Sequence, residues 1–220
     1  MPPRIARPFA RNPLLRVLVP SYVVLWAVAG LRPVDRETWV LENVLAVLLF
    51  GALALTHRRF VFSNLSYLLI FAFLLLHVPG SHYTYSAVPV GDAVREIFGL
   101  ERNPYDRFVH FDFGLLLAYP IRELLLRTLH LRGRASWTAP TLCVLALSSA
   151  YEILESWAAR LFDSEAGVAF VGAQGDVWDG QKDMSLALVG AILAMLLAHR
   201  VRRRTGREAY RVFLAAETPG

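Results

Sequence analysis

Residues 103–114 read NPYDRFVHFDFG and bring four ionisable side chains, Asp106, Arg107, His110 and Asp112, into the start of an apolar run. A charged side chain in the hydrocarbon of a bilayer costs about 3 kcal/mol or more, so such residues usually face the interior of a helical bundle, a water-filled cavity or one another. We therefore interpret the rest of the chain as a scaffold that presents this stretch to other acidic segments.

The composition indicates a membrane protein. The chain has 220 residues, of which 55% are hydrophobic and 19% are charged. Its apolar residues gather in six runs, each close to the roughly 17–25 residues that cross a bilayer as a helix. The predicted spans are residues 14–31, 40–56, 62–78, 108–126, 138–157 and 183–199. We predict an all-α, polytopic helical bundle of about six transmembrane helices.

The distribution of basic residues predicts how this bundle is oriented. Sixteen Lys and Arg residues fall on one predicted side of the membrane: Arg4, Arg7, Arg11, Arg16, Arg58, Arg59, Arg122, Arg127, Arg132, Arg134, Arg200, Arg202, Arg203, Arg204, Arg207 and Arg211. Seven fall on the other: Arg32, Arg36, Arg95, Arg102, Arg107, Arg160 and Lys182. The positive-inside rule then places both termini in the cytoplasm.

This orientation divides the chain into three parts. Residues 1–13 form a basic cytoplasmic tail, residues 14–199 form a membrane domain with an outer loop at 79–105, and residues 200–220 form a second basic tail. The basic residues follow the loops and form no stripe on a soluble face, so we expect membrane lipids, and no nucleic acid, as partners. Protein partners are not identified by any pattern in the sequence.

The outer loop is long enough to hold structure of its own. The third span is expected to end at Pro79-Gly80, and Asp92 is expected to cap a short helix that Gly99 terminates. Val94, Ile97 and Phe98 would give this helix an apolar side, so we expect it to lie over the mouth of the bundle. Glu42, one turn into the second span, is expected to be either a solvated charge at a helix end, which is the favoured interpretation, or a residue that points into the bundle.

Three polar helix ends fall on the predicted outer side. Asp106 and His110 are four residues apart and share a helix face, where the carboxylate could orient the imidazole. Glu152 and Glu155 belong to the fifth predicted span. Asp176, Asp179 and Asp183 lead into the sixth and would share one side if that segment were helical. Asp112 lies on a different face from Asp106 and His110.

Such a cluster admits three kinds of chemistry. A divalent metal is the cofactor that this set allows, with His110, Glu152, Glu155, Asp179 and Asp183 as ligands. General acid–base catalysis is the second, by four candidate catalytic residues, Asp106, His110, Glu152 and Asp183. A structural network is the third, in which Arg107, Arg122, Arg160 or Lys182 neutralises the acids. A substrate entrance is predicted at His82, Tyr83, Arg107, Tyr151, Gln174 and Asp176.

The order of these motifs resembles the YjdF family of uncharacterised bacterial inner-membrane proteins. The residues that carry the resemblance are His82-Tyr83-Thr84-Tyr85, Pro89, Arg102 to Arg107, His110, Arg122-Glu123, Tyr151 to Glu155, Gln174 to Asp179, Gln181, Asp183 and Gly190. The resemblance implies a multi-pass protein of the bacterial cytoplasmic (inner) membrane and places the site at these motifs. It implies no particular reaction.

A more distant similarity is to VanZ-like membrane proteins. Their pattern of an Asp, a basic residue and a His is similar to Asp106, Arg107 and His110, and their helix-borne Glu is similar to Glu152. Their Asp, Asn and Gly pattern is similar to Asp183, Ala187 and Gly190, with Ala187 in place of the amide.

Two functions follow from these patterns. The protein either binds or acts on a cell-envelope lipid or lipid-linked substrate at its outer mouth, or it is a non-catalytic membrane scaffold or accessory protein whose charged network is structural. Whether it is an enzyme stays open. A transporter is disfavoured because the charges gather at one end, whereas a crossing pathway also needs polar residues at mid-membrane.

Overall fold

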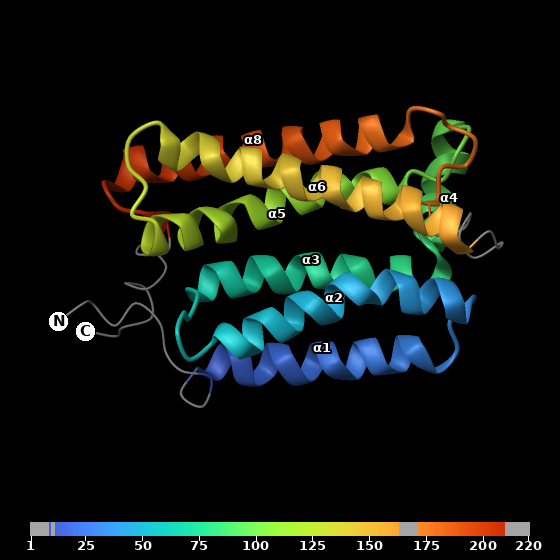
Figure 1. Cartoon of the computed structure of the whole chain (residues 1–220), viewed down its shortest axis with the longest axis horizontal. Coiled ribbons are helices and arrows are strands. Elements are labelled where there is room, and N and C mark those ends of the chain that lie inside the picture. Colours follow the sequence, from blue (N-terminus) through green and yellow to red (C-terminus); the bar gives the residue numbers. More distant parts are fainter. Residues whose placement is uncertain (1–8, 10–11, 163–170, 210–220) are drawn as a thin grey trace.

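The computed structural model describes residues 9, 12–162 and 171–209, and within them the regular structure is entirely helical. The helices, labelled as in Figure 1, are α1 Pro13–Leu31, α2 Arg36–Thr56, α3 Asn64–Tyr83, α4 Pro89–Phe98, α5 Tyr105–Thr128, α6 Ala135–Phe162 and α8 Asp179–Thr205, with a 3-10 turn η2 Tyr85–Ala87. This confirms the predicted all-α, polytopic class.

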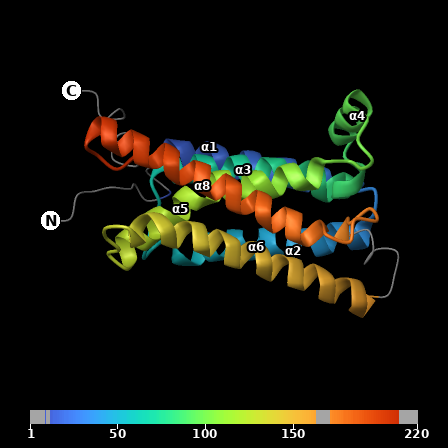
Figure 2. The same ribbon diagram turned by 90° about the horizontal axis from the view of Figure 1, so that it is seen from above.

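The long helices run side by side in two layers (Figure 1). Helices α1, α2 and α3 form one layer, and α5, α6 and α8 form the other. The α2–α3 and α5–α6 connections lie at one end of the bundle, together with the start of α1 and the end of α8. Helix α4 lies at the opposite end and crosses the direction of the bundle (Figure 2). We call this opposite end the outer end, after the orientation that the basic residues predict.

Five of the described helices, α1, α2, α3, α6 and α8, are long and apolar enough to cross a membrane. Helix α5, the fourth predicted span, is not among them because it carries several charges. It lies at the centre of the bundle and packs against α8, α3 and α6. Asp106, Asp112, Arg122 and Glu123 on α5 are all buried. The bundle therefore shields the charges of α5 from lipid, as the cost of a lipid-exposed charge requires.

Small residues allow α5 and α8 to approach closely. A Cβ atom at Gly114 of α5 would collide with the backbone carbonyl of Ala187, and one at Gly190 of α8 would collide with the backbone of Phe111. Interfaces between membrane helices favour such residues because they let two backbones come together. This crossing fixes α8 against the helix that carries Asp106 and His110.

Three predicted helix boundaries were wrong. Helix α3 continues through Pro79 to Tyr83, which is tolerated in membrane helices because neighbouring groups satisfy the freed carbonyl. Helix α4 begins at Pro89, so Asp92 lies inside its first turn and does not cap it; proline is well suited to the first helical position. Helix α8 begins at Asp179, four residues before the predicted start.

The predicted end of α4 was correct, and its interfacial placement stays a prediction. Gly99 ends the helix in a left-handed conformation with φ 61°. The side chains of Ile97 and Phe98 are exposed. The buried residue of α4 is Gly91, which packs against Asn103. The face of α4 that carries Gly91 therefore packs against the protein, and the large apolar side chains of the helix point away from it.

Candidate functional site

The start of α5 places the central residues of the site. The side chain of Asn103 accepts a hydrogen bond from the backbone N–H of Tyr105 at 3.0 Å and donates one to the carbonyl of Val88 at 3.0 Å. It thereby joins the first turn of α5 to the segment before α4. Asp106 and His110 follow on one face of the helix, as their spacing predicts, and both are buried.

His110 lies among carboxylates from three helices. Its Nε2 atom is 3.6 Å from an Asp106 oxygen and 3.6 Å from Glu152 Oε1 on α6. Asp183 on α8 completes the group, because Asp106, His110 and Asp183 each offer a ligand atom within 4.8 Å of the others. We call these four residues, Asp106, His110, Glu152 and Asp183, the His110 cluster.

Gly180 allows α6 and α8 to meet at this cluster. It lies in the first turn of α8, where a Cβ atom would come within 2.6 Å of Glu152 Oε2. A larger residue would push the carboxylate away from His110. The early start of α8 also puts Asp179 and Asp183 one turn apart on the same side of the helix.

Two arginines hold a second group of acids beside the cluster. Arg102 pairs with Asp179, lies 3.6 Å from Asp106, and donates to the carbonyls of Gly172 and Ala173. Arg107 pairs with Asp176 and lies 3.5 Å from Asp179. These contacts fasten the segment before α8 onto the start of α5.

The hydrogen bonds of Asp176 favour its ionised form. Its carboxylate accepts a hydrogen bond from Lys182 Nζ at 2.6 Å and one from the backbone N–H of Trp178 at 3.0 Å. These bonds favour the charged form, and together with Arg107 they lower the pKa of Asp176 to about 2. Asp176 therefore stays ionised at physiological pH and forms ion pairs with Arg107 and Lys182.

The charges around His110 do not balance. Among the described residues, the guanidinium groups of Arg102 and Arg107 are engaged with Asp106, Asp176 and Asp179. Four further acids have no Arg or Lys ion pair in the described chain: Glu42, Glu152, Glu155 and Asp183. Glu152 Oε1 and Asp183 Oδ1 are also buried without a hydrogen-bond partner. The His110 cluster thus holds more carboxyl groups than the Arg and Lys side chains of the described residues compensate, and it has acceptor atoms without a donor.

The predicted entrance residues are dispersed. Arg107 and Asp176 form the ion pair above, and the Gln174 amide makes two hydrogen bonds to the backbone of Asn103. His82 Nδ1 lies 2.8 Å from the carbonyl of Ala29 and its ring packs edge-on against Tyr83, so this pair joins α3 to α1. Of the six predicted entrance residues, Tyr151 alone lines the large cavity described below.

Four further residues contribute polar groups at the outer end. Of the two interpretations of Glu42, the favoured solvated one was wrong: the residue is only 3% exposed and accepts a hydrogen bond from the Tyr151 hydroxyl at 3.4 Å. His77 Nδ1 and the Tyr85 hydroxyl lie 2.6 Å apart. Arg102 is the fourth. The sequence signal for Glu42 was its position one turn inside an apolar run. Only the packing of the helices shows that its side chain faces the interior of the bundle.

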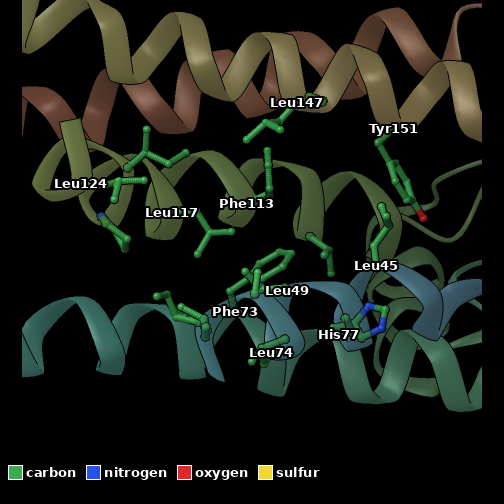
Figure 3. A pocket seen from close by; sticks show the side chains of 18 of the residues that line it. Leu45, Leu49, Phe73, Leu74, His77, Phe113, Leu117, Leu124, Leu147 and Tyr151 are labelled. Carbon is green, nitrogen blue, oxygen red and sulfur yellow. The ribbon is translucent and has the colours of Figure 1, made fainter. Parts of the chain in front are cut away.

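A cavity of about 680 Å³ runs from the His110 cluster along the bundle. It lies between α2 and α3 on one side and α5 and α6 on the other, and Figure 3 shows Leu49, Phe73, Phe113 and Leu117 pointing into this space. Its outer end is polar and is lined by Glu42, His77, Tyr85, Asp106, His110, Ser148 and Tyr151. The rest of its wall is almost entirely apolar.

The far end of α5 carries a separate charged group. Glu123 accepts hydrogen bonds from Ser63 and Ser66, and the buried Arg122 guanidinium pairs with Glu208 at 2.5 Å and lies 3.7 Å above the Trp137 ring. Arg122 is therefore remote from the acids of the His110 cluster. Asp112, as expected, does not belong to the cluster either.

Comparison with known proteins places the chain in a family. The fold and the buried charges define a multi-pass helical membrane protein. The chain belongs to the family described as predicted membrane protein (DUF2238), whose model matches residues 14–204. It is 40% identical to the inner membrane protein YjdF of Escherichia coli (strain K12) over 176 residues, which cover 80% of this chain and 84% of that protein. No solved structure matches.

These matches confirm the predicted family and the inner-membrane location. The similarity to VanZ-like proteins stays a prediction, and the fold gives a physical reason for Ala187. This residue is fully buried against Gly114 at the α5–α8 crossing. An asparagine side chain would not fit there without moving the two helices apart.

Proposed function

We propose that the protein binds a membrane-resident amphiphile, a lipid or lipid-linked molecule, with its chain in the large cavity and its polar group at the His110 cluster. The single observation that carries this proposal is the continuity of the cavity. The same cavity is lined by Asp106 and His110 at its polar end and by the apolar residues Leu49, Leu117 and Leu124 further along.

The dimensions of the cavity support a long apolar ligand. Its lining on α2 extends from Glu42 to Thr56, which is about 21 Å at 1.5 Å per residue, against a hydrocarbon thickness of about 30 Å. The volume of about 680 Å³ falls within the range of ligand pockets, roughly 300–1,000 Å³.

The packing of α2 supports access from the bilayer. Helix α2 packs mainly on α3 and makes no extensive contact with α6, although both helices line the cavity. A chain could therefore enter sideways between α2 and α6 without crossing the polar end.

The polar end favours a particular kind of head group. Carboxylates without an Arg or Lys partner attract groups that donate hydrogen bonds or carry positive charge. Hydroxyl or amine groups therefore suit Glu42, which lines this end of the cavity and has no such ion pair in the described chain. His110 lies between Asp106 and Glu152 and has the geometry of a proton-transfer group. A smaller cavity of about 310 Å³ between α1, α2 and α3 has no carboxylate in its lining, which is why we do not assign the ligand to it.

Photochemical labelling tests the proposal. The protein would be reconstituted into vesicles that contain phosphatidylethanolamine and phosphatidylglycerol with a diazirine in the acyl chain, and labelled residues would be mapped by mass spectrometry. We expect labelling of the interior residues Ile70 and Leu117, which line the cavity and are buried from the outer surface. Labelling confined to exposed residues such as Leu48 and Leu55 would contradict the proposal.

Two neighbouring substitutions on α2 provide a matched comparison. Leu49 lines the cavity, whereas Leu48 is exposed on the outside of the bundle. Leu49→Trp should fill the cavity and reduce the labelling of Leu117 severalfold, whereas Leu48→Trp should leave it unchanged because its side chain stays outside. An equal effect of the two variants would argue against a ligand in the cavity.

The scaffold alternative makes a different prediction at the polar end. If the charges serve binding, His110→Ala and Glu152→Gln should change labelling while the protein accumulates normally in the membrane. If the charges are structural, both variants should lose abundance together. The Arg102 and Arg107 pairs already provide contacts that fasten the segment before α8, so the structure favours a binding role for the His110 cluster.

A further inference from the structure

Asp183 carries a buried carboxyl group whose hydrogen-bonding capacity is not satisfied by the described residues. Its side chain is 2% exposed and Oδ1 has no hydrogen-bond partner in the described chain. A buried carboxylate without compensation costs several kcal/mol, so such groups are usually paired or bind a metal. Both arginines near it are already engaged with other acids.

The geometry around Asp183 is close to that of a metal site. One oxygen from Asp183, one oxygen from Asp106 and one ring nitrogen from His110 lie within 4.8 Å of one another, on two helices held together by the α5–α8 crossing. Ligands of one tetrahedral zinc ion lie about 2.0–2.2 Å from it, so small side-chain rotations would bring these atoms onto one ion. Glu152 Oε1, unpartnered and 3.6 Å from His110, is a fourth donor.

We infer that Asp106, His110 and Asp183, with Glu152 as a fourth donor, form a binding site for one divalent transition-metal ion at the outer end of the bundle.

The donor set selects the class of metal. Carboxylate oxygens suit Mg²⁺, Ca²⁺ or Mn²⁺, whereas a buried imidazole favours a transition metal such as Zn²⁺, so Zn²⁺ and Mn²⁺ are the ions to test. An ion of charge +2 would also compensate the excess acids, since Glu152 and Asp183 have no Arg or Lys partner among the described residues. Asp179, predicted as a ligand, instead pairs with Arg102.

The ion would lie at the polar end of the same cavity, so the inference builds on the proposed function. Asp106 and His110 line both the cavity and the predicted ion site. A bound ion there would polarise an oxygen of the head group. Glu42 and Tyr151, which line the same polar end and are joined by a hydrogen bond, would face the ligand.

Metal binding can be measured without knowing the ligand. The protein would be purified with a tag that contains no histidine, stripped with a chelator and equilibrated with MnCl₂ or ZnCl₂. Bound metal would be determined by mass spectrometry, and thermal unfolding would be followed with and without the ion. We expect about one ion per chain and a higher Tm with the ion, because a ligand that binds only the folded state stabilises it.

Asp183→Asn and Asp112→Asn form the matched pair for this test. Both replace a buried carboxylate that has an unpartnered oxygen, but Asp112 lies outside the cluster. Asp183→Asn should weaken metal affinity by more than the roughly 10–100-fold that loss of an outer partner costs, and the ion should no longer raise its Tm. Asp112→Asn should bind metal as the wild type does.

Two results would overturn the inference. Wild-type protein that holds neither Mn²⁺ nor Zn²⁺ above the chelated background would do so, as would equal binding by Asp183→Asn and the wild type. Lipid labelling is a separate measurement. If the protein binds no metal but is still labelled at Leu117, the metal site is rejected and the proposed lipid binding stands. If it binds metal but is not labelled there, the metal site stands and the proposed lipid binding is rejected.

Discussion

Glu123 and Asp183 are buried carboxyl groups on neighbouring helices that differ in how many hydrogen-bond donors surround them. Glu123 on α5 accepts hydrogen bonds from the Ser63 N–H at 2.9 Å, the Ser63 hydroxyl at 2.6 Å and the Ser66 hydroxyl at 2.5 Å, and it pairs with Arg127. Oδ1 of Asp183 has no such partner in the described chain. Glu123 therefore holds Ser63, the N-cap residue of α3, in place and is structural, whereas the Asp183 carboxyl group retains the capacity to bind a ligand.

Substitution of Glu123 should destabilise the fold. Glu123→Gln removes the charge that Arg127 and the two serines compensate, and breaking a buried charged network of this kind costs about 3 kcal/mol. Thermal unfolding in detergent should show a Tm several degrees lower. Glu96→Gln is the control, because Glu96 is exposed on α4, and it should unfold like the wild type. A Glu123→Gln protein of unchanged Tm would show that the charge of Glu123 is dispensable for stability.

At the scale of elements, the α5–α8 pair positions the site. These two helices carry Asp106, His110 and Asp183, and their separation is set by Gly114, Ala187 and Gly190. A backbone cannot move aside as a side chain can, so added volume at this crossing must change the distance between the helices.

Two glycines on different helices test this dependence. Gly190→Ala should lower stability by about 1–3 kcal/mol because its Cβ meets the backbone of Phe111. Gly51→Ala, on α2, has no atom within 4 Å of the added Cβ, so it should be neutral or stabilise by roughly 0.5–1 kcal/mol through helix propensity. Unfolding in detergent measures both. If the two variants behaved alike, the crossing would not be tightly packed.

At the scale of the whole molecule, the two ends of the bundle differ in charge. The end that holds the α2–α3 and α5–α6 connections carries Arg58, Arg59, Arg132 and Arg134, whereas the acids gather at the outer end (Figure 1). The positive-inside rule therefore predicts that the His110 cluster faces away from the cytoplasm.

Cysteine labelling checks this orientation. Cys143 is the one cysteine of the sequence, and its replacement by alanine provides a background for single cysteines. In intact cells, a membrane-impermeant maleimide should label the Glu96→Cys variant, because Glu96 lies at the outer end. It should label the Arg132→Cys variant only after the membrane is permeabilised. The reverse pattern would place the His110 cluster on the cytoplasmic side.

The sequence by itself determined the class, five of the predicted spans and the family. Hydropathy along a helix is a local property, and the four-residue spacing of Asp106 and His110 decides which face they share. The accumulation of acids at one end also follows from counting charges by loop. These features need no knowledge of which helices touch.

Only the tertiary structure decided what each polar group faces. The rotation of α2 turned Glu42 inward, the crossing at Gly190 brought Asp183 to His110, and Arg102 took Asp179 as its partner. The cavity also arises from the spacing of four helices. Helix rotation and long-range pairing depend on packing between segments distant in the chain, which periodicity within one segment does not encode.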